Sequence, residues 1–268
     1  MRLKPLLFAA GCVLLPLAPA TCAATRKPAR HHRSTVTQRK RLNVNDLITE
    51  PGTIELDWGN LYSYSTQSFT MPSAVKYTPS GSGLFWGRTE YSAAFDSLAS
   101  DLDTEGRNSR FSDRVSFTAT SVLYGSDHFD IAFAPQVTTF LRDESGVRAG
   151  ATAIARYDGG GNSVGVTMGW SAATASSSTN PAGAWDFGAG FGRPLARSGL
   201  LAHFTPHLNV VLEKSTGLER TASTFGGVEY QITRQIAFDV SGQRIGLPGG
   251  GADRQFALGL TINLGKPH

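Results

Sequence analysis

The chain has 268 residues, with 30 glycines, 15 phenylalanines and only 17% charged residues. This composition excludes general disorder, and the lack of apolar runs of about 18 residues after the N-terminal segment excludes a bundle of transmembrane helices. The formal net charge of +4 does not predict nucleic-acid binding, because nine of the 25 Lys and Arg residues precede Asn43 while all 21 Asp and Glu residues follow it.

The segment 1–23 has the layout of a secretory signal peptide. Two basic residues precede an apolar run over residues 6–15, and small residues close the segment at Ala20 and Ala23. We expect cleavage after Ala23, with Ala20 as the alternative. The only cysteines of the chain are Cys12 and Cys22, so cleavage after Ala23 leaves no thiol for chemistry.

The segment 24–42 is basic, with seven Lys or Arg residues and no acidic residue. Such a segment buries too little apolar surface to fold by itself, so we expect a disordered periplasmic leader. It either attaches to an anionic surface or is simply solvated. The adjacent His31 and His32 lack a third ligand and do not predict a metal site.

Apolar and polar residues alternate from Thr53 onward, which is typical of β-strands with two different faces. Clusters of turn-forming residues divide this part into twelve segments. The expected strands are 53–65, 69–78, 84–97, 111–124, 128–141, 147–157, 163–174, 184–194, 200–213, 223–233, 236–246 and 255–264. Residues 44–48 and 95–102 show helical spacing and predict two short helices. Pro135 and Pro206 fall within strands, where we expect a bulge or a change of register.

Three features favour a membrane barrel over a soluble β-sandwich, which alternates in the same way. Most segments are long enough for a tilted strand to cross a bilayer. Tight turns such as 195–199 tend to alternate with long loops such as 214–222, as on the two rims of outer-membrane barrels. An even number of strands closes an antiparallel ring. The sequence therefore predicts an all-β protein: a closed antiparallel up-and-down transmembrane β-barrel of about twelve strands over residues 43–268. Its expected location is the outer membrane of a Gram-negative-type bacterium.

The stretch that leads into the first strand, from Val44 to Leu56, reads VNDLITEPGTIEL. This N-D-x-x-T-E-P-G-T-x-E-L pattern resembles the bacterial outer-membrane barrel proteins named for the MetA pathway of phenol degradation, which are described as transporters. The resemblance implies transport, with a preference for hydrophobic or aromatic compounds. The closing alternation from Gly259 to Leu264 resembles the final-strand signal that the barrel assembly machinery reads, although Leu264 stands where a terminal Phe is usual.

The polar face of the strands supplies candidate residues for a lumen. We expect eight charged side chains to line it: Arg88, Glu90, Arg114, Asp130, Arg148, Arg156, Glu229 and Asp239. The arginines predict a weak preference for anions, diluted by the neighbouring acids. The expected function is an outer-membrane channel or transporter for small solutes, without cofactor, metal or catalytic residues. The expected partners are outer-membrane lipid and lipopolysaccharide, the barrel assembly machinery and a small-molecule solute, but no nucleic acid.

Three alternatives stay open. A structural or adhesive barrel would conduct nothing and would have a lumen closed by paired charges. An outer-membrane lipid hydrolase would need a nucleophile next to a histidine. His203 and His207 lie four residues apart on the expected ninth strand, about 13 Å by strand rise, and no Ser-Asn-Gly motif such as outer-membrane phospholipases carry lies nearby. The third alternative is a soluble periplasmic β-sandwich.

Overall fold

The computed structural model describes residues 47–81, 88–101, 108–110, 114–141, 146–175, 182–246 and 251–265. The expected signal peptide, the expected leader and the start of the expected barrel domain at residues 43–46 lie outside these ranges. Cleavage after Ala23 and the behaviour of the leader therefore stay predictions. In the described ranges, no helix is long and apolar enough to cross a membrane.

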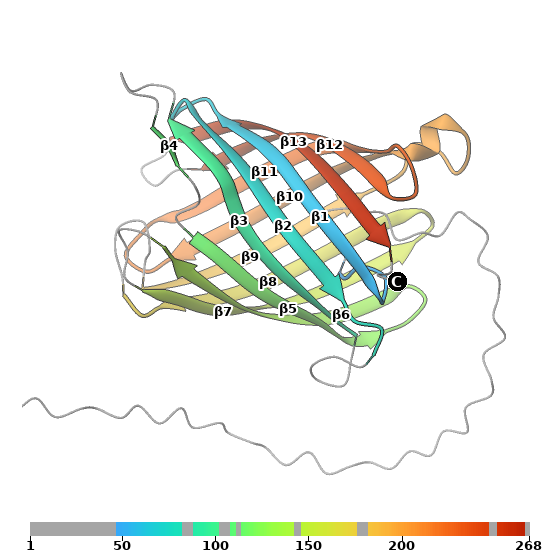
Figure 1. Ribbon diagram of the computed structural model, residues 1–268, viewed down its shortest axis with the longest axis horizontal. Helices are drawn as coiled ribbons and strands as arrows, with labels where there is room; N and C mark the ends of the chain where they lie inside the picture. The colour runs from blue at the N-terminus through green and yellow to red at the C-terminus, as the bar shows by residue number, and fades with distance from the viewer. Residues whose placement is uncertain are drawn as a thin grey trace, which may run out of the picture. The chain divides into compact units, whose positions relative to one another are not determined.

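Twelve strands of the described chain form one closed antiparallel ring (Figure 1). They are β1 (Thr53–Ser63), β2 (Ser68–Thr78), β3 (Thr89–Asp101), β5 (Arg114–Gly125), β6 (Phe129–Phe140), β7 (Val147–Gly159), β8 (Asn162–Ala173), β9 (Gly183–Gly192), β10 (Phe204–Ser215), β11 (Arg220–Gln231), β12 (Ile236–Gly246) and β13 (Ala252–Gly265). A short additional strand, β4 (Asn108–Arg110), pairs with the end of β3. The first strand β1 pairs with the last strand β13, which closes the ring. The predicted up-and-down barrel of about twelve strands is confirmed.

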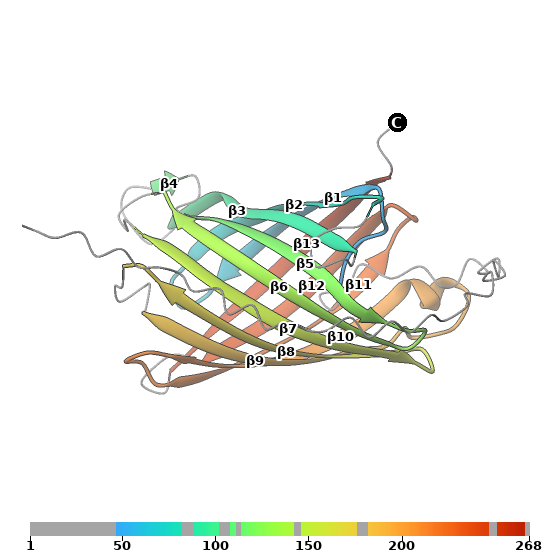
Figure 2. The same ribbon diagram turned by 90° about the horizontal axis from the view of Figure 1, so that it is seen from below.

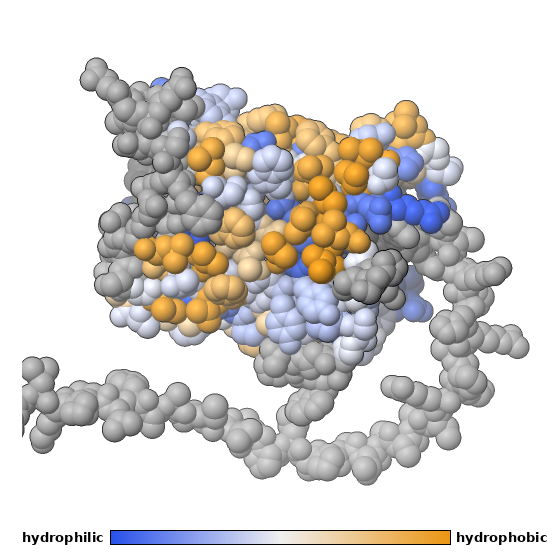
Figure 3. All heavy atoms as spheres, viewed as in Figure 1, coloured by the Kyte–Doolittle hydropathy of each residue, from blue (hydrophilic) through white to orange (hydrophobic). Residues whose placement is uncertain are grey.

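The outer face of this ring is apolar. Large side chains such as Trp58, Met168 and Phe187 are 50%, 56% and 50% exposed, and Figure 3 shows apolar side chains spread over the face in view. The buried apolar residues of the described chain are few, namely Leu47, Ile48, Val122, Ala132, Ala134 and Ala237. A soluble sandwich would bury an apolar core between two sheets, so this alternative is excluded. A closed ring with an apolar exterior is suited to lipid instead.

The chain connections lie at the two ends of the barrel (Figures 1 and 2). We call the end where β1 begins and β13 ends the terminal rim, and the opposite end the loop rim. On the terminal rim, β7 and β8 are joined by Gly160 and Gly161 alone, with φ angles of 63° and 83°. Glycine adopts such angles without steric penalty, which permits this two-residue hairpin.

The predicted strand 200–213 begins later than expected, because residues 200–203 form a helical turn. Gly199, with a φ of 77°, turns the chain into the short 3₁₀ helix η2 (Leu200–His203), so β10 begins only at Phe204. The connection between β9 and β10 on the terminal rim therefore spans 193–203, whereas β10 and β11 are joined on the loop rim by 216–219. The expected tight turn at 195–199 and long loop at 214–222 are both wrong.

Neither predicted short helix forms in the described part of the chain. Residues 47–50 have no regular secondary structure, and Phe95 and Leu98 belong to β3, which continues to Asp101. This end of β3 pairs with β2 and with β4, and ladder pairing outweighs the local helical spacing. Leu102, the last residue of that spacing, lies outside the described residues.

The expected register changes at Pro135 and Pro206 are wrong. Both prolines pair with their neighbouring strands, β7 and β11, without a shift, because the ladder bonds on either side hold the register. One of the irregularities lies instead at Met71 and Pro72, where Ser97 is the extra residue of β3. The Ser97 hydroxyl donates to the Met71 carbonyl oxygen at 3.0 Å, which satisfies a group at the bulge.

Candidate functional site

The inner wall of the barrel is the candidate functional surface. It consists of every second residue of each strand, on the side opposite the exposed apolar side chains. In the described strands this wall carries four cationic and eleven acidic residues, a formal charge of −7. The cationic residues are Lys76, Arg114, Arg148 and Arg156, and the acidic residues are Glu55, Asp57, Glu90, Asp96, Asp130, Asp158, Asp186, Glu213, Glu229, Asp239 and Asp253. The net charge of the wall is therefore negative, whereas the weak anion preference expected from the sequence was based on the positive arginines.

Lys76 of β2 forms ion pairs with two carboxylates of β1. Lys76 Nζ lies 2.9 Å from Glu55 Oε1 and 2.6 Å from Asp57 Oδ2. Glu55 is 1% exposed, and in the described chain no donor reaches its Oε2 or Asp57 Oδ1. The cluster therefore keeps an excess of negative charge after its internal pairing.

The chain enters β1 along the inner wall. Leu47 and Ile48 are buried at 4% and 2% exposure, although they precede the first strand. The N–H of Thr49 donates to Glu90 Oε2 at 2.7 Å, and the Thr49 hydroxyl lies 2.8 Å from that of Thr78. Because Glu90 and Thr78 have the inward parity of β3 and β2, residues 47–50 narrow the barrel at the terminal rim. We call these residues the entry segment.

An ion pair lies on β7 near the same rim. Arg156 Nε lies 2.8 Å from Asp158 Oδ2, and Arg156 Nη2 donates to Asp158 Oδ1 at 2.9 Å. Asp130 of β6 stands opposite Arg156 in register. Arg148, at the other end of β7, donates from Nη1 to the Ser171 hydroxyl at 2.7 Å. The two β7 arginines are therefore held against the wall at opposite ends of the strand.

A buried histidine lies on β10. The side chain of His207 is 2% exposed, and its Nε2 lies 3.6 Å from Asp239 Oδ2. In the described part of the chain neither ring nitrogen has a hydrogen-bond partner, so no nucleophile is positioned on this histidine as a hydrolase requires. His203 is the last residue of η2, on the rim, with Nδ1 3.0 Å from the Gln231 carbonyl oxygen. The expectation that both histidines lie on one strand is therefore wrong.

Metal ligation has no geometric basis among these side chains. Within the described ranges, no group of three or more His, Cys, Asp or Glu residues is arranged to hold a metal ion. The charged side chains of the wall act through their electrostatic potential and hydrogen bonds.

The wall formed by β8 and β9 has small side chains. Its inward residues on β8 are Ser163, Gly165, Thr167, Gly169, Ser171 and Ala173, and those on β9 are Ala184, Asp186, Gly188, Gly190 and Gly192. Asp186 is the only charged residue of this set, and Glu213 of β10 stands opposite it in register. We call these two strands the small-residue sector. Because its side chains are short, they project little into the barrel.

The eight residues predicted to line a lumen are distributed around the ring. Seven of them have the inward parity of their strands: Glu90, Arg114, Asp130, Arg148, Arg156, Glu229 and Asp239. Arg88 precedes β3 and is exposed, and its carbonyl oxygen accepts from the Val122 N–H at 2.9 Å. The register brings Asp130 opposite Arg156 and Glu229 opposite Asp239. Several further charges also have inward parity and were not predicted, among them Glu55, Lys76, Asp186 and Glu213, although the alternation of their strands indicates them.

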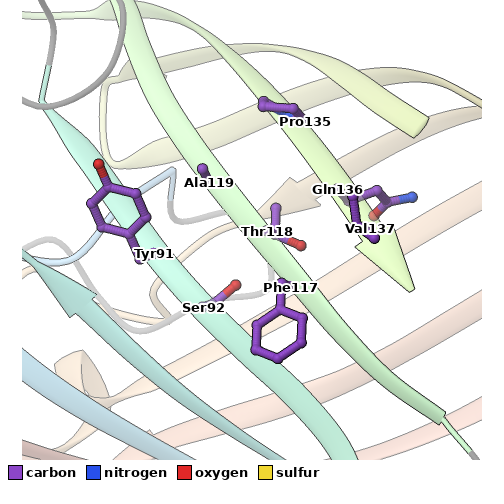
Figure 4. Close-up of a pocket in the computed structure, with 8 residues that line it drawn as sticks. All are labelled: Tyr91, Ser92, Phe117, Thr118, Ala119, Pro135, Gln136 and Val137. Atoms are coloured by element: carbon purple, nitrogen blue, oxygen red, sulfur yellow. The ribbon is translucent and has the colours of Figure 1, made fainter. Parts of the chain in front are cut away.

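A shallow hollow on the outer face crosses β3, β5 and β6 (Figure 4). The small Ala119 lies between the larger side chains of Tyr91, Phe117, Pro135 and Val137. Tyr91, Phe117 and Val137 belong to the exposed apolar set of the barrel, so the hollow opens toward lipid. An acyl chain suits this apolar lining better than a polar solute does.

Comparisons with known proteins agree with this architecture. No protein-family model and no curated protein matches the chain. The NanC porin is similar with a TM-score of 0.57 and 10% identity, covering 78% of this chain and 100% of the porin. The KdgM porin has a TM-score of 0.52 and 7% identity, covering 78% and 98%. The β-domain of the Bordetella autotransporter BrkA has a TM-score of 0.50 and 9% identity, covering 79% and 98%.

At such low identity these likenesses show the fold, and the fold alone does not define the function, since porins and an autotransporter domain share it. The predicted outer-membrane location is confirmed by this fold together with the apolar exterior. The closed ring, its apolar outer face and its charged inner wall make this chain an outer-membrane β-barrel.

Proposed function

We propose that the protein is an outer-membrane channel for small solutes. The observation that carries this proposal is the small-residue sector, where the inward side chains of β8 and β9 are too short to fill the barrel. Twelve strands enclose a wider interior than the eight-stranded barrels that side chains fill completely. The fold similarity to two porins supports the same function.

The entry segment limits the size of the solute. Its residues 47–50 are hydrogen-bonded to Glu90 and Thr78 at the terminal rim, and Leu47 and Ile48 are buried there. The passage is therefore confined to the side of the small-residue sector, and ions and small polar molecules are its candidate solutes.

The alternative functions are less well supported by the described residues. A non-conducting structural barrel would need inward side chains that fill or pair across the whole ring, and the small-residue sector does not supply them. A lipid hydrolase would need a nucleophile on His207. The resemblance to the phenol-degradation family implies a preference for hydrophobic or aromatic compounds, and this preference stays a prediction. The apolar hollow does not support it, because the hollow lies on the lipid-facing side of the wall and not in the lumen.

Single-channel recording in planar bilayers tests the proposal. The folded protein should give discrete conductance steps. The variant Thr167→Trp places an indole on the inward face of the small-residue sector and should lower the conductance of each step. Its matched control is Met168→Trp, which changes the next residue of β8 on the outward face, where Met168 is 56% exposed. Heat-modifiability on a denaturing gel verifies that both variants are folded.

The two variants separate the possible functions. Reduced conductance for Thr167→Trp with unchanged conductance for Met168→Trp supports passage through the lumen. A folded wild-type barrel that leaves the bilayer resistance unchanged would overturn the channel and favour a structural barrel.

A further inference from the structure

We propose that the lumen passes cations in preference to anions. This inference rests on the proposed channel function and names the class of solute for it. It reverses the weak anion preference that the arginines alone predict.

The first basis is the charge of the inner wall. Eleven acidic residues and four cationic residues face inward in the described strands. Pairing within the wall, as of Lys76 with Glu55 and Asp57 or of Arg156 with Asp158, does not change the net formal charge of −7, because eleven carboxylates outnumber four cations. The field of this excess negative charge attracts cations and opposes anions within a Debye length of about 8 Å at physiological salt.

The second basis is the placement of like charges. Asp186 stands opposite Glu213 on β9 and β10. Carboxylates in directly opposed positions repel each other and destabilise a sheet. A cation in the lumen relieves this repulsion, so the register of this pair points to a cationic occupant.

A third and independent basis is the set of unpartnered oxygens. Glu55 is only 1% exposed, yet no donor in the described chain reaches its Oε2. Asp57 Oδ1 is likewise a buried oxygen that no donor of the described chain reaches. Buried carboxylate oxygens without donors are unfavourable unless a cation or its hydration shell is present.

The position of Asp186 connects these charges to the passage. The small-residue sector is the open side of the wall, and Asp186 is its only charged side chain, with Glu213 beside it. A solute that passes along this sector meets two carboxylates there, and the only cation nearby on the neighbouring strand β7 among the described inward residues at this height, Arg148, donates to Ser171. The carboxylates therefore dominate the selectivity of the open side.

The test measures the reversal potential of the purified protein in planar bilayers under a potassium chloride gradient. The wild type should show a K⁺-to-Cl⁻ permeability ratio above unity. Asp186→Asn should lower this ratio, by about twofold for the loss of one charge in a water-filled passage. Arg148→Gln should raise it. The matched control is Asp127→Asn, which removes one exposed carboxylate in the turn between β5 and β6 and should leave the ratio unchanged.

The outcomes distinguish this inference from the channel itself. Conductance with a ratio at or below unity overturns the cation preference and leaves the channel standing. Equal effects of Asp186→Asn and Asp127→Asn also overturn it, because the selectivity would then not arise at the inner wall. The absence of conductance from folded wild-type protein overturns the channel and, with it, the inference.

Discussion

The carboxylate of Asp186 lies directly over the Cα of Gly169 on the neighbouring strand, in the place that a Cβ at position 169 would occupy. The two residues are paired in register across β8 and β9, and Gly169 is buried beneath the acidic side chain. Glycine at this position allows a charged group to lie flat on the inner wall, which keeps the small-residue sector open.

Substitution of this glycine should therefore disturb the lumen. We predict that Gly169→Ala displaces the Asp186 carboxylate away from the wall. The free energy of unfolding should fall by about 1 kcal/mol, which is at the low end for overpacking because the Asp186 side chain can rotate away. Urea unfolding in lipid vesicles measures this. Gly242→Ala on β12 is the control, since a Cβ there meets only one atom at 4.0 Å. Equal stability of the two variants would contradict the packing relationship.

The entry segment provides a second prediction. Glu90→Ala removes the acceptor of the Thr49 N–H, so residues 47–50 should detach from the wall and the single-channel conductance should rise. Loss of this charge-assisted bond should also lower the free energy of unfolding by about 1.5–3 kcal/mol. Glu90→Gln has the same loss of charge but keeps a carbonyl acceptor, and its conductance should stay near that of the wild type. A rise of the same size in both variants would assign the effect to charge instead.

The lysine between β1 and β2 should be important for stability. Lys76→Met leaves Glu55 and Asp57 without their shared cation, and Glu55 is almost fully buried. We expect a loss of about 3 kcal/mol in the free energy of unfolding, as for other broken buried pairs. The double variant Lys76→Met with Glu55→Gln should recover part of this loss, since it removes the most deeply buried charge. No recovery in the double variant would contradict this cause.

The two faces of the strands should differ in their tolerance of charge. Phe187 is 50% exposed on the outer face of β9, and Thr118 has the inward parity of β5. Phe187→Arg places a charge in lipid and should lower the free energy of unfolding from vesicles by about 2–4 kcal/mol. Thr118→Arg faces the polar interior and should change it little. Folded fractions from heat-modifiable gels measure both, and equal tolerance would argue against lipid on the outer face.

The sequence by itself determined the architecture. Alternation with a period of two is a property of the extended backbone, so it is visible in segments such as Phe129–Phe133 without knowledge of any neighbouring strand. The same alternation predicts which charges share a face, as for Glu90 and Asp239. Local spacing was misleading only where pairing or a turn residue overrode it, as at Phe95 in β3 and at Gly199 before η2.

The tertiary structure alone decided how the inner wall is organised. Closure of β1 on β13 sets the register of the whole ring, and register decides which residues of different strands become neighbours. It places Asp186 over Gly169 and opposite Glu213, and it joins Lys76 to Glu55. The contact of Thr49 with Glu90 spans 41 residues of sequence. Local patterns carry no information on such distant pairs, because those pairs depend on the stagger that accumulates around the closed barrel.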